Sequence, residues 1–235
     1  MTDRPILFSA PMVQALLAGR KTQTRRMLNP QPYSDVGGFE KVFTQPPYFE
    51  ARDLVGNPHP SAFPQGKHLV TPFPNVRFAI GDRLWVKETW RTHKRWDGFK
   101  PSDITPAARI WHEADGRDNC DQHGKTRVSI FMPRWASRLT LLVTDVRVER
   151  LQDCSQDDAI AEGIEADTDG WRDYLMPSTQ CCMVAQDSYA TLWNSINGPG
   201  AWEANPWVVA VSFDVQRGNT DTPASKTQAA EVGRG

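Results

Sequence analysis

The stretch Leu139-Thr-Leu-Leu-Val-Thr-Asp-Val-Arg-Val-Glu-Arg150 is the longest strand-like run in the chain. Charged and apolar side chains alternate along its second half, so that Asp145, Arg147 and Glu149 share one face and the valines share the other. A period of two, kept over this length, predicts one long β-strand.

A short helix is expected directly after this strand, over Ser155-Gln-Asp-Asp-Ala-Ile-Ala-Glu-Gly163. Ser155 is a favourable N-cap, Asp158 stands at the capping-box position, and Gly163 suits the residue after the last turn. Glu162 then lies in the last turn, where the helix dipole disfavours a carboxylate. It is either a solvated side chain or an acid retained for a function.

Further elements are expected on both sides of this pair. The apolar pattern predicts helices at Ala10–Ala18, capped by Ser9 and ended by Gly19, and at Ser188–Ile196. Strands are predicted from Gly81-Asp82 through Leu84, Val86 and Trp90, and at Arg109–Ala114 and Pro206–Val215. Residues 165–185 have the composition of a loop.

Residues 29–75 differ from the rest of the chain, because they hold nine of its eighteen prolines and few aliphatic residues. Such a segment predicts an irregular insertion, neither a helix nor a central strand. It can be a surface loop without a function or a lid. Residues 217–235 are polar and are expected to be a disordered tail.

Strands dominate the middle of the chain, and no alternation of strands and helices suggests parallel βαβ units. The pattern predicts an α+β fold, a small and mostly antiparallel β-barrel with short flanking helices and a long proline-rich insertion. We expect a single domain over residues 1–216.

The charge distribution bears on the class of partner. The formal net charge is −1, so no global basic field favours non-specific nucleic-acid binding. Residues 1–28 nevertheless carry five cations against Asp3, whereas residues 145–173 carry ten acids against three arginines. A local basic site that faces a local acidic one suits a small polar ligand better than a long duplex.

The four cysteines include no Cys-x-x-Cys pair and are interpreted as reduced thiols of a cytoplasmic protein. Cys120 and His123 form a lone Cys-x-x-His with no second half at zinc spacing, so we expect no metal and no cofactor. No signal peptide and no membrane span is visible.

The densest cluster of reactive side chains is Gly19-Arg-Lys-Thr-Gln-Thr-Arg25-Arg26, which holds four cations and two hydroxyls. Such a cluster can hold a phosphate or a carboxylate. It can also bring an amine next to a hydroxyl, which is one way to activate a nucleophile.

This cluster carries a resemblance to a known family. Gly19, Lys21, Thr24 and Arg26 follow the spacing Gly-x-Lys-x-x-(Thr/Glu)-x-Arg of the ASCH family, whose fold is similar to the PUA domain. Gly81-Asp82 before a strand matches the family's second landmark. The runs Gly81–Trp90, Met132–Arg138 and Asn205–Trp207 resemble the long ASCH proteins that bacteriophages and prophages carry, which would act in the host cytoplasm. The resemblance covers most of residues 6–28 and 78–215.

The resemblance implies a function and a site. Small bacterial N4-acetylcytidine amidohydrolases of this family use a Lys, a Thr and a Glu. Lys21 and Thr24 match the first two by motif, and Glu162 matches the third through Ala159-Ile-Ala-Glu162 after the long strand. The implied activity is removal of an acyl group from an N4-acylated cytidine-type substrate. The partner would be a modified pyrimidine nucleoside or a single-stranded nucleic acid.

Amide hydrolysis needs a nucleophile, a proton acceptor and stabilisation of an oxyanion. Thr24 can attack the acyl carbon, and Lys21 can accept its proton if burial or neighbouring cations lower its pKa. Glu162 can orient the lysine or donate to the leaving amine. A flat strand from Lys21 to Thr24 would point the two side chains to opposite faces and prevent this cooperation.

Other side chains are candidates for substrate binding. Arg20, Arg25 and Arg26 can contact an anionic group or the oxyanion. The remaining candidates are Glu88, Trp90 and Trp135, for which a strand ion pair and core packing are the structural alternatives.

Several functions compete with hydrolysis. In a non-catalytic RNA-binding or modified-DNA-binding module, the cations would hold a phosphate and a tryptophan would stack on a base. A nuclease is a further alternative, and so is a phage interaction protein that acts through its proline-rich region. The cationic cluster can also be no more than a solvated edge.

Overall fold

The structure is a computed structural model that describes residues 2–33, 36–42, 48–59, 63–65, 69–71, 76–116, 121–178 and 181–221. The chain groups into two compact units, each made of separate segments. Unit 1 comprises Met1–Thr2, Pro11–Asp82 and Leu142–Val215, and unit 2 comprises Asp3–Ala10, Arg83–Leu141 and Gln216–Gly235. The expected single domain stays a prediction.

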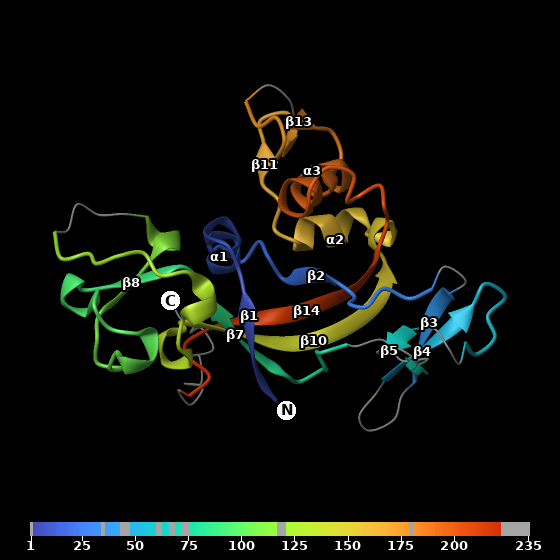
Figure 1. Cartoon of the computed structure of the whole chain (residues 1–235). Helices are drawn as coiled ribbons and strands as arrows, with labels where there is room; N and C mark the ends of the chain where they lie inside the picture. Colours follow the sequence, from blue (N-terminus) through green and yellow to red (C-terminus); the bar gives the residue numbers. More distant parts are fainter. Residues whose placement is uncertain are drawn as a thin grey trace, which may run out of the picture. The chain divides into compact units, whose positions relative to one another are not determined.

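Unit 1 holds the α-helices and most of the small sheets (Figure 1). Its helices are α1 (Ala10–Leu17), α2 (Gln156–Ala161) and α3 (Ala185–Asn197), with the 3-10 turn η6 (Leu151–Asp153) before α2. Its strands are β2 (Gln23–Met27), β3 (Val36–Val42), β4 (Tyr48–Asp53), β5 (Phe63–Gln65), β6 (Leu69–Thr71), β11 (Ala166–Asp167), β12 (Gly170–Arg172), β13 (Cys181–Cys182) and the greater part of β10 (Leu139–Arg150) and β14 (Trp207–Arg217).

Unit 2 is built from short strands and 3-10 turns. Its strands are β1 (Asp3–Leu7), β7 (Arg83–Lys87), β8 (Trp90–Thr92) and β9 (Ile110–His112). Its turns are η1 (Lys94–Trp96), η2 (Pro101–Asp103), η3 (Glu113–Asp115), η4 (Ser129–Phe131) and η5 (Arg134–Ala136). None of the helices in the part of the chain that the structure describes is long and apolar enough to cross a membrane.

The fold is α+β, as the sequence predicts, but its sheets are not closed into a barrel. The largest sheet has five strands in the order β1-β7-β10-β14-β2, and β10 and β14 each contribute residues to both units. β1 pairs with β7 in parallel, whereas β14 pairs with β2 antiparallel. A barrel would need its first and last strands to pair. Here the strand order ends at β1 and β2, so the expected closed barrel is corrected to an open sheet.

The expected long strand and its helix are found where the sequence places them. β10 spans Leu139–Arg150, and Figure 1 shows it as a long curved strand beside β14. Ser155 caps α2, because its hydroxyl accepts from the Asp158 N–H while the Asp158 carboxylate accepts from the Ser155 N–H. α1 ends at Leu17, and Gly19, two residues later, has a φ of +72°, which suits glycine.

Other segments differ from the expectation. The proline-rich segment contains the hairpin of β3 and β4, which is a separate two-stranded sheet. Residues 165–185 contain the small sheet β11-β12-β13 instead of only a loop. The first residues of the expected tail, 217–221, are held by hydrogen bonds such as Gly218 N–H to the Arg138 carbonyl, at 2.8 Å. Residues 222–235 of that tail, and Cys120, lie outside the described residues.

Each unit has its own apolar core. In unit 1, α2 and α3 pack together over a core that includes Tyr189, Leu192, Trp193 and Val208. In unit 2 the core is centred on Trp90 and Met132, with Trp135 packed against it. The first of these cores contacts the buried part of the cationic cluster, because the Arg25 guanidinium lies 5.9 Å from the centre of the Tyr189 ring.

Candidate functional site

Lys21 lies in the turn between α1 and β2. The N–H groups of Arg20 and Lys21 both donate to the Ala15 carbonyl, at 3.0 and 3.1 Å. The next residue, Thr22, donates its N–H to the Ala161 carbonyl at the end of α2, at 2.9 Å. The backbone around Lys21 is therefore tied to both helices before the strand begins.

Lys21 and Glu162 form a buried ion pair. Nζ of Lys21 donates to Oε2 of Glu162 at 2.8 Å and to the Glu162 backbone carbonyl, also at 2.8 Å. The two side chains are only 2% and 4% exposed. Glu162 is the C-cap residue of α2, so the ammonium also neutralises the negative end of that helix. The position that is unfavourable for an isolated carboxylate is thus compensated by Lys21.

Gly163 makes this close approach possible. Its φ is +88°, and a Cβ atom built there would lie 2.8 Å from the Lys21 Cβ and 3.1 Å from the Ala15 Cβ. Any other residue at this position would displace Lys21 or α1. The glycine therefore ends α2 and also leaves the space that Lys21 occupies.

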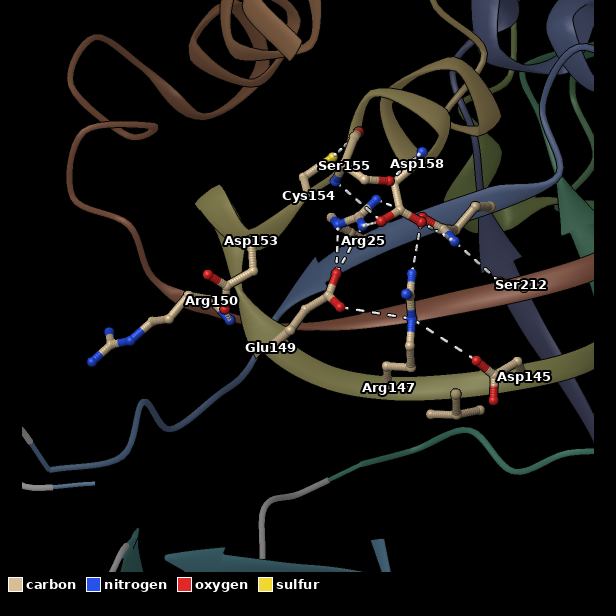
Figure 2. Close-up of polar contacts among 12 residues, drawn as sticks. Arg25, Asp145, Arg147, Glu149, Arg150, Asp153, Cys154, Ser155, Asp158 and Ser212 are labelled. Carbon is tan, nitrogen blue, oxygen red and sulfur yellow. Dashed lines mark hydrogen bonds and ion pairs between the residues drawn. The ribbon is translucent and has the colours of Figure 1, made fainter. Parts of the chain in front are cut away.

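Arg25 on β2 links three carboxylates, and Figure 2 shows two of them, Glu149 and Asp158. Its Nη2 lies 2.7 Å from Oε1 of Glu149 and 3.1 Å from Oδ2 of Asp158, and its Nη1 lies 3.3 Å from Oε1 of Glu162. Nη1 also donates to Oε1 of Gln23 at 2.5 Å. The Arg25 side chain is fully buried, so these groups together replace its hydration.

A second arginine extends the network. Arg147 on β10 donates to Oδ1 of Asp158 at 2.7 Å and lies 3.6 Å from Oε2 of Glu149 (Figure 2). Burial opposes the charge of Arg147, but its hydrogen bond to Asp158 and the charge of Glu149 raise its pKa overall. Asp158 also accepts from Nε2 of Gln23, at 3.0 Å.

The electrostatic setting shifts the pKa values of two groups in the site. Burial lowers the pKa of Lys21, the charges of Arg26 and Arg25 act in the same direction, and Glu162 opposes them. Burial and the negative charge of Glu162 raise the pKa of the Tyr189 hydroxyl well above its usual value. The Arg25 guanidinium lies 5.9 Å from the centre of the Tyr189 ring. These shifts favour a neutral phenol and bring Lys21 closer to the neutral amine that a general base must be.

Thr24 is buried in β2, three residues after Lys21, and lies opposite Val211 of β14. Its neighbours Gln23 and Arg25 both contact Asp158 of α2, so Thr24 points to the other face of the strand. Lys21 precedes the strand, but its Nζ contacts Glu162, the carboxylate that Arg25 also contacts, so the contacts join Lys21 to Arg25 and not to Thr24. Joint action of Lys21 and Thr24 stays a prediction.

The remaining cations of the cluster are nearer to solvent. Arg20 is exposed, donates to the Gly163 carbonyl at 3.0 Å and lies 3.9 Å from Oε1 of Glu165. Arg26 is exposed on β2, opposite Val209. Of the three arginines predicted to bind substrate, Arg25 is therefore a buried structural link, and the other two lie at the surface of unit 1.

The other three predicted substrate-binding residues belong to unit 2. Glu88 is buried and accepts two hydrogen bonds from Arg138, at 2.9 and 3.0 Å, so its ion-pair partner is Arg138 instead of Lys87. Trp90 is fully buried in the unit 2 core, and Trp135 is half-buried against it. Their contacts are those of the structural alternatives, an ion pair and core packing, and their role in substrate binding stays a prediction.

Sequence reasoning missed part of the network around Lys21. Gln23, Glu149, Asp158 and Tyr189 all contact its members, yet none was a candidate. A signal for Glu149 and Asp158 was available. Glu149 shares one face of β10 with Arg147, and both acids belong to the acidic residues 145–173 that complement the basic cluster. Tyr189 carries no such signal, because its position reads as the apolar face of a helix.

The arrangement can move a proton between a buried amine and a buried carboxylate. Within the described ranges, no group of three or more His, Cys, Asp and Glu residues is placed to hold a metal ion. Comparison with protein-family models, with curated proteins and with solved structures finds no match for this chain. Its function is therefore argued from the residues and their geometry.

Proposed function

We propose that this chain is an ASCH-like amidohydrolase of PUA-like fold that removes an acyl group from N4-acylated cytidine-type substrates. The observation that carries the proposal is the buried contact of 2.8 Å between Nζ of Lys21 and Oε2 of Glu162. These residues lie 141 positions apart in the sequence, and the family resemblance names both of them for catalysis. Buried, perturbed titratable pairs are typical of active sites.

In the proposed reaction, the hydroxyl oxygen of Thr24 attacks the acyl carbon and the neutral amine of Lys21 takes the hydroxyl proton. The tetrahedral intermediate collapses to an ester on Thr24, and the N4 amine leaves with the proton that Lys21 returns. Water then hydrolyses the ester and gives the acid. Glu162 holds the ammonium of Lys21 in place, and the lowered pKa of Lys21 makes it easier for this ammonium to lose its proton and become the neutral base.

The same contacts argue against phosphate binding as the role of this cluster. Phosphate recognition needs cations whose charge is not already matched by carboxylates. Lys21 is paired with Glu162, Arg25 contacts three acids, and Arg20 lies near Glu165. The local basic excess of the sequence is thus largely neutralised in the fold, which supports the hydrolase over the binding module here.

The test is turnover of N4-acetylcytidine by the purified protein, measured as release of cytidine and acetate. Lys21→Met keeps the aliphatic stem but removes the amine, and we expect a loss of about 10²–10⁴-fold in kcat/KM. Lys41→Met is the matched control, because Lys41 also pairs with an acid, Asp145, at 3.3 Å. It should retain wild-type turnover.

Thr24 is tested separately with Thr24→Val, and exposed Thr22→Val is its control. Turnover that survives in Thr24→Val but not in Lys21→Met would assign the nucleophile to water and remove Thr24 from the mechanism. Wild-type turnover in Lys21→Met would refute the proposed site. Absence of hydrolysis by the wild-type protein on a panel of N-acylated pyrimidine nucleosides and bases would refute the proposed function.

A further inference from the structure

Unit 2 contains a buried arginine that has no carboxylate partner among the residues the structure describes. Arg127 is 6% exposed, and its guanidinium donates only to backbone carbonyls, from Nη1 to Phe99 at 3.2 Å and from Nη2 to Trp96 at 2.7 Å. Buried charges in proteins are normally matched by an opposite charge. An unmatched guanidinium therefore calls for an explanation.

Three acids of unit 2 have other partners. Asp97 follows η1, the turn that covers Arg127, but its Oδ1 accepts from the Lys125 N–H at 2.9 Å. Glu113 accepts two hydrogen bonds from Arg91, at 2.7 and 3.0 Å. Glu88 is held by Arg138. The positive charge of Arg127 thus stays available to an anion from outside the described residues.

Two polar atoms on β8 are buried and have no hydrogen-bond partner among the residues that the structure describes. They are Nε1 of Trp90 and Oγ1 of Thr92, and Nε of Arg127 is also buried without a hydrogen-bond partner. Trp90 and Thr92 are both fully buried. Buried polar atoms are satisfied in the great majority of cases, so three of them on neighbouring residues indicate a missing acceptor.

These three residues share one face of a small antiparallel ribbon. The Trp90 N–H donates to the Arg127 carbonyl at 3.1 Å, and the Arg127 N–H donates to the Trp90 carbonyl at 2.8 Å. Residues paired in this way project their side chains to the same side, and Thr92 joins them because it lies two residues along β8. The Arg127 guanidinium lies 5.6 Å from the centre of the Trp90 ring, which agrees with this placement.

We propose that the face formed by Trp90, Thr92 and Arg127 binds the phosphate group of a ligand. Phosphate oxygens accept from both N–H donors and from the hydroxyl, and their charge matches the guanidinium. Phosphate offers more acceptor oxygens than a carboxylate, and three polar groups on one face suit that number. Base stacking is not the binding mode here, because the Trp90 ring is buried and covered by Arg127.

The test is isothermal titration calorimetry with three ligands that carry the same group: inorganic phosphate, cytidine 5′-monophosphate and a short single-stranded oligocytidylate. We expect saturable binding at one site, weakened by salt because it rests on a charge. Trp90→Phe removes the indole N–H, and Thr92→Val removes the hydroxyl, with little change of shape. Each should weaken binding about tenfold, the effect of one hydrogen bond to a charged group.

Trp193→Phe is the matched control, since Trp193 in unit 1 is also buried and its Nε1 is likewise without a partner. Its affinity should equal that of the wild-type protein. Saturation by inorganic phosphate would show that a free anion is sufficient. Saturation by cytidine 5′-monophosphate but not by phosphate would identify a mononucleotide as the ligand, and saturation by the oligonucleotide alone would identify a polynucleotide. Each of these results supports the site. Absence of saturable binding for all three ligands, or wild-type affinity in both Trp90→Phe and Thr92→Val, would overturn the proposal.

Discussion

Replacement of Gly163 by alanine tests whether the end of α2 holds Lys21 in position. Gly163 has a φ of +88°, and an added Cβ would lie 2.8 Å from the Cβ of Lys21 and 3.1 Å from that of Ala15. Both neighbours are Cβ atoms attached to well-held backbone, so they have little room to move. The substitution should therefore strain the backbone and displace the lysine at the same time.

The magnitude follows from two contributions. A left-handed φ costs a residue with a side chain about 1–2 kcal/mol, and overpacking of a buried site costs about 1–3 kcal/mol. We expect Gly163→Ala to lower the free energy of unfolding by about 2–5 kcal/mol. Gly19→Ala is the control, because Gly19 has a similar φ of +72° but an added Cβ would meet nothing within 4 Å. It should cost only the first contribution, about 1–2 kcal/mol.

The assay is urea unfolding of both variants at pH 7, followed by far-UV circular dichroism, together with turnover of the acylated nucleoside. Gly163→Ala should lose more stability than Gly19→Ala and should lose turnover, whereas Gly19→Ala keeps turnover once its folded fraction is taken into account. Equal losses of stability in the two variants would refute the reasoning, because they would show that the contact with Lys21 is not tight.

Two further predictions concern ionisable groups of unit 1. Despite its partial burial, Asp158 has a lowered pKa because Arg147, Ser155, Gln23 and Arg25 stabilise its carboxylate. The contribution of Asp158 to the free energy of unfolding is therefore complete above the ordinary pKa of an aspartate, about 4, and is lost as the pH falls below it. The urea midpoint should therefore fall less steeply between pH 6 and pH 3 in Asp158→Asn than in the wild type or in Asp157→Asn, and parallel curves would contradict the assignment. Burial raises the pKa of the Cys154 thiol to about 12, so a thiol reagent at pH 8 should label exposed Cys181 and spare Cys154 in the native protein, as mass spectrometry of the peptides would show. Labelling of Cys154 at the rate of Cys181 would contradict its burial.

The long elements could be predicted because several signals agree within each of them. In Leu139–Arg150 the alternation of side chains fixes the strand, and in the helix after it Ser155 and Asp158 form the expected cap. The small sheet β11-β12-β13 could not be predicted, because strands of two or three residues carry no measurable period. The hairpin of β3 and β4 was hidden by the prolines of its surroundings.

The site shows a similar division. The meeting of Lys21 and Glu162 followed from a short motif and from the place of one glutamate after a strand. The role of Arg25 did not, because a cationic run in a sequence reads as solvated or ligand-binding until its partners are known. Glu149 and Asp158 come from separate elements, and only the strand pairing of β2, β14 and β10 brings them to the same guanidinium.

The carboxylate of Asp158 joins three elements of unit 1 in a single group. It accepts from the Ser155 N–H at the start of α2, from Gln23 on β2 and from Arg147 on β10, and it lies 3.1 Å from Arg25. A helix of six residues would by itself fray within the native state. Opening of the first turn would also release both strands from this carboxylate, so we expect the amide protons of α2 to exchange with solvent as slowly as those of the sheet beside it.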